Sequence, residues 1–361
     1  MFALPALAQD IGASAQVDAC IAIEIDVERL ACYDNALGRH PADTVAADEQ
    51  ARAARLELER RKAAEATQRE HDGAVFAIDE PSAANALANA GKGSLLDSRW
   101  ELAKDSKLGL FQMRAYKPVY LLPAFWTSRV NDLPHSPNPR NTVTEPLELQ
   151  DLEAKFQLSF KTKFAENLFG DNGDLWGAYT QSSRWQVFNG DNSRPFRETN
   201  YEPEVMLVFR NNYTIGGWNG RMTGIGINHQ SNGRSDPLSR SWNRIIASFG
   251  LDRENWAFVV RPWWRVPDGD DDDNPDIEDY IGRGDAMLTW TNRGHVFTVL
   301  GRHSLRSGEK SHGALQVDYG FPINRSFRAH MQLFHGYGES MIDYNHKATY
   351  FGLGISLLDW Y

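Results

Sequence analysis

Apolar and polar residues alternate one by one along most of the chain after residue 97. The clearest case is the segment 155–164. One side of the extended chain there carries Phe156, Leu158, Phe160, Thr162 and Phe164, and the other carries Lys155, Gln157, Ser159, Lys161 and Lys163. A period of two residues predicts β-strands rather than helices. An apolar face opposite a lysine-rich face is typical of a membrane barrel with a wet, polar interior.

The same alternation predicts about twelve strands. Their expected ranges are 116–130, 150–166, 174–188, 200–213, 217–231, 239–250, 255–266, 277–291, 294–305, 312–322, 326–337 and 347–361. The last range alternates Phe351, Leu353, Ile355 and Leu357 and ends on the aromatic Tyr361, although Asp359 interrupts its apolar face. An even number of strands joined by short turns and longer loops is expected for a bacterial barrel. We therefore predict an all-β fold, a twelve-stranded antiparallel transmembrane β-barrel with a helical N-terminal extension.

The first 96 residues have a different composition. Residues 1–44 surround two cysteines, Cys20 and Cys32, and residues 45–96 read as a helical spacer followed by an Ala-, Gly- and Ser-rich linker. A disulfide between the cysteines would fit an oxidising periplasm, and two reduced thiols are the alternative. Residues 1–8 contain a small-x-small pattern and are a candidate remnant of a signal peptide, with an ordinary N-terminus as the alternative. The barrel domain is expected at 97–361, with the extension in the periplasm.

Charge and hydropathy narrow the classes of function. The net charge of −10 makes sequence-independent nucleic-acid binding unfavourable, because such binding relies on Lys and Arg. The sequence contains no run of about 18 apolar residues, so no transmembrane helix is expected. The 11 Trp, 12 Tyr and 18 Phe residues favour a β-rich or interfacial protein.

The segment GIGINHQSNGRSDPLSRSWN, residues 224–243, is dense in polar side chains. His229 and Ser231 are two residues apart, so on a strand they point to the same side. A hairpin that turns through Gly233 and Pro237 would place Asn243 on the next strand beside His229. The residues that share these faces are apolar, namely Ile225 and Ile227 on the first strand and Ile245, Ala247 and Phe249 on the second. The three polar residues are therefore expected on the lipid-facing side, at the rim of a barrel.

Serine, histidine and asparagine in this arrangement favour nucleophilic catalysis. A serine hydroxyl is a weak nucleophile until a base takes its proton, and the pKa of histidine suits that role near neutral pH. A third group must hold the imidazole in the correct tautomer. An asparagine carbonyl can do so without placing a charge near lipid. A structural or incidental His-x-Ser pair is the alternative that the spacing alone leaves open.

Five long motifs resemble the outer-membrane phospholipase A family of Gram-negative bacteria. They are YTQSSRWQ, SRPFRETNYEPE, NHQSNGRSDPLSRSWNR, DDNPDI and GYGESMIDYN. The resemblance covers roughly residues 97–361 in one continuous order. It implies phospholipase A1/A2 activity, which is the calcium-dependent hydrolysis of the acyl esters of phospholipids and lysophospholipids. It also implies location in the outer membrane and activation by formation of a homodimer.

The resemblance also implies roles for individual residues. Ser231 matches the nucleophile, His229 the base, Asn243 the orienting residue, and Gly233 a backbone donor to the oxyanion. Calcium (Ca2+) would be bound by the Arg234 carbonyl and the Ser239 hydroxyl of one subunit and by Ser193 of the other. Asp236 and Asp273 match acidic residues linked to calcium in the monomer. Gln181 matches a polar residue of the dimer interface within lipid.

Two points remain open at this stage. The acidic loop 267–274 reads as a solvated external loop, and an additional weak calcium site is its alternative. A non-catalytic outer-membrane barrel, such as a porin or adhesin, would share the alternation, and so would a barrel protease. Neither rival explains why His229, Ser231 and Asn243 should lie on the lipid-facing side.

Overall fold

The computed structural model describes residues 17–38, 49–50, 52–57, 59–60, 88–323 and 327–358. The chain forms two compact units, Met1–Ile78 and Asp79–Tyr361. The helices are α2 (Asp26–Ala36), α5 (Leu95–Trp100) and α6 (Ile277–Tyr280), and the 3-10 helices are η1 (Lys104–Ser106), η2 (Pro139–Asn141), η3 (Gly269–Asp271) and η4 (Gly308–Lys310). No helix in these ranges is long and apolar enough to cross a membrane.

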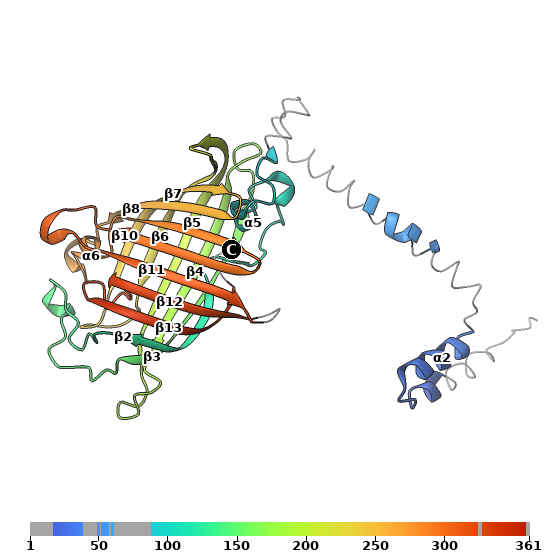
Figure 1. Cartoon of the computed structure of the whole chain (residues 1–361), viewed down its shortest axis with the longest axis horizontal. Helices are drawn as coiled ribbons and strands as arrows, with labels where there is room; N and C mark the ends of the chain where they lie inside the picture. The colour runs from blue at the N-terminus through green and yellow to red at the C-terminus, as the bar shows by residue number, and fades with distance from the viewer. Residues whose placement is uncertain are drawn as a thin grey trace, which may run out of the picture. The chain divides into compact units, whose positions relative to one another are not determined.

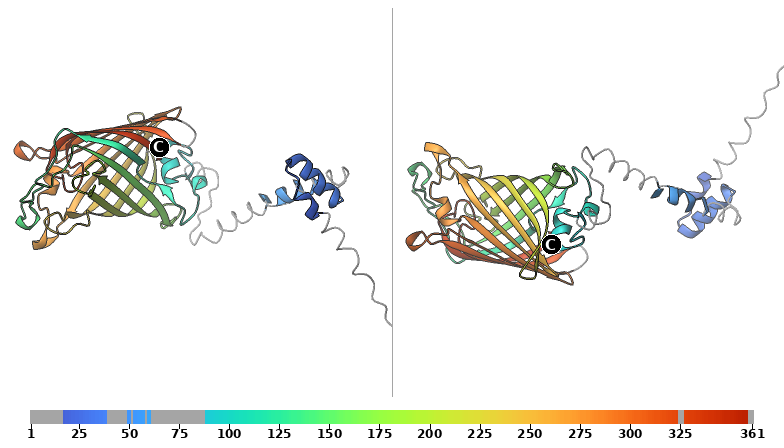
Figure 2. Two further views of the ribbon diagram at one scale, coloured as in Figure 1. Left: turned by 90° about the horizontal axis from the view of Figure 1, so that it is seen from below. Right: turned by 90° about the horizontal axis from the view of Figure 1, so that it is seen from above.

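The second unit is a barrel of antiparallel strands (Figures 1 and 2). The strands are β1 (Arg114–Ala115), β2 (Val119–Thr127), β3 (Leu152–Ala165), β4 (Asp174–Trp185), β5 (Phe196–Ile215), β6 (Trp218–Ser231), β7 (Ser241–Arg253), β8 (Trp256–Val266), β9 (Gly284–Asn292), β10 (His295–His303), β11 (Gly313–Pro322), β12 (Arg328–Tyr337) and β13 (Lys347–Leu358). In the described residues, the twelve strands β2 to β13 pair with their neighbours, and β13 pairs with β2 to close the ring. The predicted all-β, twelve-stranded fold is confirmed.

The predicted strand at 277–291 is wrong in its first part. Residues 277–280 form α6, and β9 begins at Gly284. Ile277 and Ile281 are four residues apart and are both buried in one cluster with Trp242 and Trp263. Residues four apart share a face in a helix and in a strand alike, so the spacing does not decide between them. The Ile281 N–H donates to the Ile277 carbonyl at 2.9 Å, which is the i→i−4 hydrogen bond of a helix. Burial of both isoleucines against the tryptophans stabilises this helical turn.

The barrel has two different ends. At the turn end, short connections join the strands, including Gly216-Gly217 and residues 293–294; at the loop end, longer connections gather, among them 128–151, 186–195, 232–240 and 267–283. Helix α5 packs at the turn end, where Leu96 and Trp100 are buried with Trp176 and Met222. This helix starts inside the segment expected to be a linker, because Leu96 has an apolar core to enter.

Alternation separates the outside of the barrel from its interior as the sequence predicts. Leu158, Phe160 and Phe164 are exposed on the outer surface, whereas Lys155 is buried within. The interior is lined by polar and charged side chains. Lys155 Nζ lies 2.7 Å from Glu339 Oε1, and Arg184 contacts the same carboxylate at 2.7 Å. These buried ion pairs line a polar cavity of about 170 Å³.

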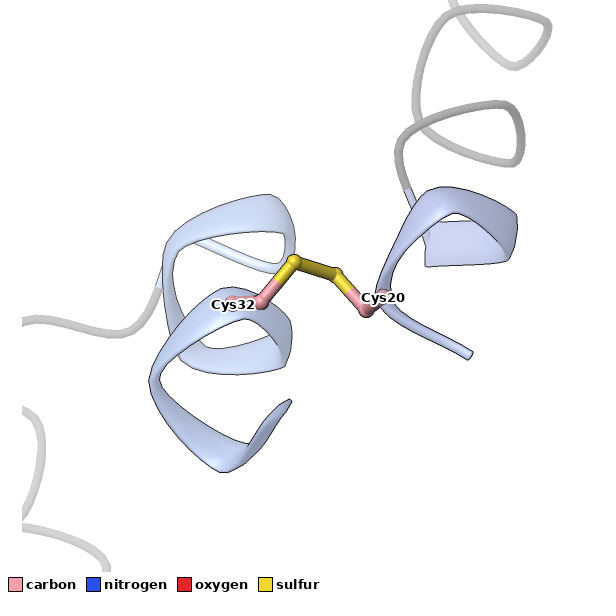
Figure 3. Close-up of a disulfide and its surroundings, with 2 residues drawn as sticks. All are labelled: Cys20 and Cys32. Atoms are coloured by element: carbon pink, nitrogen blue, oxygen red, sulfur yellow. A yellow bond between two sulfur atoms is a disulfide. The ribbon is translucent and has the colours of Figure 1, made fainter. Parts of the chain in front are cut away.

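The first unit contains α2 and a disulfide between Cys20 and Cys32 (Figure 3). Of the two alternatives left by the sequence, the structure therefore has the disulfide rather than two thiols. Residues 52–57, within the segment expected to be a spacer, are helical. The signal-peptide remnant at 1–8, much of the spacer and linker, and the positions of Asp359 and Tyr361 lie outside the described residues.

Candidate active site

The hairpin of β6 and β7 brings His229 and Asn243 side by side. The two residues are direct partners in the register of the strands. Their outward direction follows from their neighbours, since Ile227 is 64% exposed whereas Arg244, on the opposite parity, is buried in the interior. The structure thus places the pair on the outer, apolar face near the loop end, as the parity of the sequence predicts.

The imidazole of His229 is oriented by an amide. His229 Nδ1 lies 2.8 Å from Asn243 Oδ1, and Asn243 Nδ2 donates to Asp268 Oδ1 at 2.8 Å. Because the amide oxygen can only accept, Nδ1 carries the proton in this arrangement. The other ring nitrogen, Nε2, then keeps its lone pair. This is the tautomer that a general base requires.

Ser231 is the last residue of β6 and shares the outward parity of His229. Its side chain is partly exposed, and in the described part of the chain its hydroxyl has no hydrogen-bond partner. Two strand residues of the same parity are roughly 6.6 Å apart along the chain, a gap that two side chains leaning toward each other can bridge. The hydroxyl is therefore available to the imidazole and to a substrate.

Gly233 follows two residues after Ser231 and has a left-handed backbone with φ of +61°. A Cβ atom at this position would lie 2.9 Å from Tyr201 Cε2, so the site accepts only glycine without strain. Among the described residues, its backbone N–H has no hydrogen-bond partner. The amide is free to donate to a negatively charged oxygen beside Ser231.

Four of the five expected calcium ligands lie in two neighbouring loops at the loop end, 232–240 and 267–283. Ser239 Oγ donates to Asp273 Oδ2 at 2.7 Å. Asn141 Nδ2 donates to Asp236 Oδ1 at 3.0 Å and to the Ser239 carbonyl at 3.2 Å. Arg234 is exposed in the same loop. Sequence reasoning missed Asn141, because its loop reaches this site only across the barrel.

Ser193 lies apart from that cluster. It is exposed in the β4–β5 loop, with a left-handed backbone at φ of +55°. Within the described ranges, no contact joins its side chain to Arg234 or Ser239. The same ranges contain no cluster of three His, Cys, Asp or Glu side chains that could hold a metal. Any ion at this site would therefore depend on hydroxyl and carbonyl oxygens as well as carboxylates.

Several carboxylates of the acidic loop contact neighbouring side chains. Asp271 pairs with Arg140 at 2.8 Å, Asp272 pairs with Arg265, and Asp273 accepts from Ser239. Asp268 accepts from Asn243, a contact that sequence reasoning missed. The strand register brings the two together, because Val266 is the strand partner of Asn243 and Asp268 follows only two residues later.

Gln181 lies on the outer parity of β4, where Leu158 and Tyr201 are its strand partners. Leu158 is 52% exposed, so this polar side chain sits on an apolar, lipid-facing surface. Its Oε1 accepts from the Tyr179 hydroxyl at 3.2 Å. An amide in such surroundings needs further partners, which a second copy of the chain could supply.

Comparison with known proteins connects this barrel to enzymes. The family model described as phospholipase A1 matches residues 96–357. A relative from Neisseria meningitidis serogroup B, provisionally named phospholipase A1, is 38% identical over 352 residues, which cover 94% of this chain and 90% of the relative. The phospholipase A1 of Escherichia coli K12 is 41% identical over 207 residues, which cover 57% of this chain and 70% of that protein.

A solved structure gives the same result for the fold. The outer membrane phospholipase of Salmonella typhi, crystallised as a dimer with bound calcium, aligns with a TM-score of 0.62 and 36% identity and covers 70% of this chain and 94% of that chain. These similarities favour a phospholipase over the porin, adhesin and protease alternatives. Together with the closed barrel, they support location in the outer membrane. The chain therefore belongs to the phospholipase A1 family.

Proposed function

We propose that this phospholipase hydrolyses the acyl esters of phospholipids and lysophospholipids through Ser231, His229 and Asn243, with calcium, and that its active form is a homodimer. The observation that carries the proposal is the 2.8 Å contact between His229 Nδ1 and Asn243 Oδ1 on the outer face of the barrel. Family membership already gives an enzyme that acts on phospholipids. The proposal concerns the groups that perform the reaction and the state in which they do so.

The chemistry follows the usual course of acyl transfer. His229 Nε2 takes the proton of the Ser231 hydroxyl as Ser231 Oγ bonds to the ester carbonyl carbon. The same Nε2–H then protonates the departing glycerol oxygen, and the C–O bond breaks to leave an acyl-serine. Water, deprotonated by His229, hydrolyses that ester and restores the hydroxyl. Asn243 keeps the proton on Nδ1 throughout, so that Nε2 alone exchanges protons.

The Gly233 backbone N–H is a suitable donor to the oxyanion, because it lies two residues after the nucleophile and has no hydrogen-bond partner among the residues that the structure describes. Calcium is a hard cation that prefers oxygen ligands. In the monomer it fits the carboxylates of Asp236 and Asp273, and in the shared site it fits the Arg234 carbonyl and the Ser239 hydroxyl. When bound, it would add positive charge beside the developing oxyanion. Ser193 of the partner subunit would complete the set.

Regulation by assembly follows from this division of ligands. If one ligand comes from a second copy, a monomer has an incomplete site and stays inactive in an intact membrane. Gln181 on the outer face of β4 supports contact between copies through its lipid-facing amide. The calcium-bound dimer of the Salmonella typhi relative supports the same view.

The proposed location of the extension is the periplasm. Short turns of bacterial barrels face that side, and α5 packs at the turn end of this barrel. The chain therefore enters the barrel from the periplasmic side. The Cys20–Cys32 disulfide is compatible with an oxidising compartment.

Asn243→Ala is the variant that tests the triad at its third member. It removes the group that orients the imidazole but leaves the nucleophile and base in place. We expect kcat to fall roughly 10- to 100-fold, with activity still measurable. The measurement is the initial rate of fatty-acid release from phospholipid in mixed detergent micelles with calcium. Wild-type turnover in this variant would contradict the assignment, and complete loss would show that orientation is too small a role for Asn243.

Gly233→Ala tests the oxyanion donor. The left-handed backbone and the 2.9 Å approach to Tyr201 mean that the added methyl group displaces the local chain. Since loss of one oxyanion donor costs about 10²- to 10³-fold, a displaced donor should lower kcat by up to about 10²-fold with little change in KM. The matched control is Gly308→Ala, which adds a methyl group at a second left-handed glycine of the loop end where nothing lies within 4 Å. Equal losses in both variants would point to loop strain instead.

A further inference from the structure

We infer that Asp268 is a positioning residue for the proposed triad, whose carboxylate holds the Asn243 amide in the orientation that leaves His229 able to act as a base. The inference rests on the proposed function. Asn243 is held at both ends, with Oδ1 2.8 Å from His229 Nδ1 and Nδ2 2.8 Å from Asp268 Oδ1. The hydrogen bonds form one line from the loop to the imidazole.

An amide needs such a partner because its two ends have nearly the same shape and opposite hydrogen-bonding character. Rotation by 180° would direct the NH2 group of Asn243 toward His229 Nδ1. That nitrogen would then have to accept, and the ring proton would move to Nε2, where it blocks general-base action. If the third member of the triad were a carboxylate, rotation would not matter, because both of its oxygens accept hydrogen bonds. Asparagine therefore requires a residue that distinguishes its ends.

A carboxylate makes that distinction in two ways. It accepts from Nδ2 in the productive orientation, and it repels the carbonyl oxygen in the rotated one, since an ionised carboxylate offers only acceptors. A hydroxyl or an amide could serve either orientation by rotating itself. Asp268 is thus well suited to select one rotamer of Asn243.

The position of Asp268 follows from the fold. Val266, the last residue of β8, is the strand partner of Asn243, and the chain leaves the sheet immediately after it. Asp268 is exposed, so its charge stays hydrated, while the neutral amide of Asn243 occupies the apolar face. The arrangement places a negative charge behind the triad without burying it next to lipid.

The test compares variants of the full chain at saturating calcium in mixed phospholipid–detergent micelles. Asp268→Ala should lower kcat roughly 5- to 50-fold, as expected for loss of a charge-assisted hydrogen bond, and leave KM nearly unchanged. Asp271→Ala is the matched control, because it removes the same charge from the same loop, where Asp271 contacts Arg140. We expect this control to keep wild-type kcat.

Two combinations separate positioning from a general effect on the loop. In the Asn243→Ala background, Asp268→Ala should cause no further loss, because the amide that it orients is absent. Asn243→Asp alone places two carboxylates together and should be impaired, and adding Asp268→Asn should restore activity by returning an amide donor to the pair. Additive losses in the first combination, or no recovery in the second, would overturn the inference.

The remaining outcomes are equally decisive. If Asp268→Ala raises the calcium concentration needed for half-maximal rate but keeps wild-type kcat at saturation, Asp268 acts on the cation and the inference is wrong. A fully active Ser231→Ala variant would remove the triad itself, and the proposed function with it. An inactive Ser231→Ala variant together with a fully active Asp268→Ala variant would leave the triad standing and reject only the role of Asp268.

Discussion

Ser231→Ala is expected to abolish phospholipid hydrolysis, with kcat reduced by at least about 10⁴-fold, while the barrel remains folded. The variant removes only the hydroxyl, which is partly exposed and has no hydrogen-bond partner in the described part of the chain. No packing or buried hydrogen bond is lost with it. His229→Ala should cause a similar loss, since nucleophile and base act as one unit. The measurement is fatty-acid release at saturating calcium, followed beside the heat-modified mobility of the barrel in gel electrophoresis.

Ser241→Ala is the matched control for this prediction. Ser241 is the direct strand partner of Ser231 in the same hairpin, and it also loses only a hydroxyl. Activity close to wild type in Ser241→Ala and none in Ser231→Ala would identify the nucleophile by position. Substantial turnover in Ser231→Ala would disprove the proposed triad, whatever the behaviour of the control.

Removal of calcium should reduce hydrolysis by more than about 10²-fold and should also shift the protein toward the monomer. The first effect follows from loss of charge stabilisation at the oxyanion. The second follows from linkage, because an ion that is shared between two subunits binds the dimer more tightly than the monomer. Activity and chemical cross-linking in detergent, each measured with calcium and with chelator, test the two effects together.

Variants of the proposed interface residue and of a proposed calcium ligand separate the two effects. Gln181→Ala should weaken association of the two subunits by about 0.6–2 kcal/mol, which is roughly 3- to 30-fold in the dimer association constant. The proposed calcium ligands of each chain are unchanged in this variant. Ser239→Ala should raise the calcium concentration required, whereas Ser235→Ala, a serine of the same loop outside the proposed ligand set, should not. A monomer that is fully active at saturating calcium would refute the shared site but not the triad.

Local patterning was sufficient for the strands and for the face on which the site lies. Side chains of an extended chain alternate strictly between two faces, so the sequence shows that Ile227, His229 and Ser231 share one face. The structure places that face on the outside of the barrel. The single loop between β6 and β7 also made the pairing of His229 with Asn243 predictable. Both features depend only on residues close in sequence.

Helix α6 shows where local patterning stops. The order of apolar and polar residues in 277–283 is compatible with a strand as well as with a helix. The sequence prediction therefore began the strand at residue 277. Their conformation depends on burial of Ile277 against Trp242, a residue 35 positions earlier on another strand. A conformation that depends on a contact with a distant residue produces no periodic pattern in the local sequence.

The sequence by itself determined a twelve-stranded barrel, its lipid-facing parity and the identity of a Ser-His-Asn candidate, because these follow from period-two alternation and short-range hairpin pairing. Only the tertiary structure decided which groups support that candidate. Asn141 reaches Asp236 from a loop 95 residues away, and Lys155 meets Glu339 across 184 residues of chain. Asp268 reaches Asn243 only because β8 pairs with β7 in one particular register. Closure of the barrel creates these contacts, and closure is a property of all the strands together rather than of any one segment.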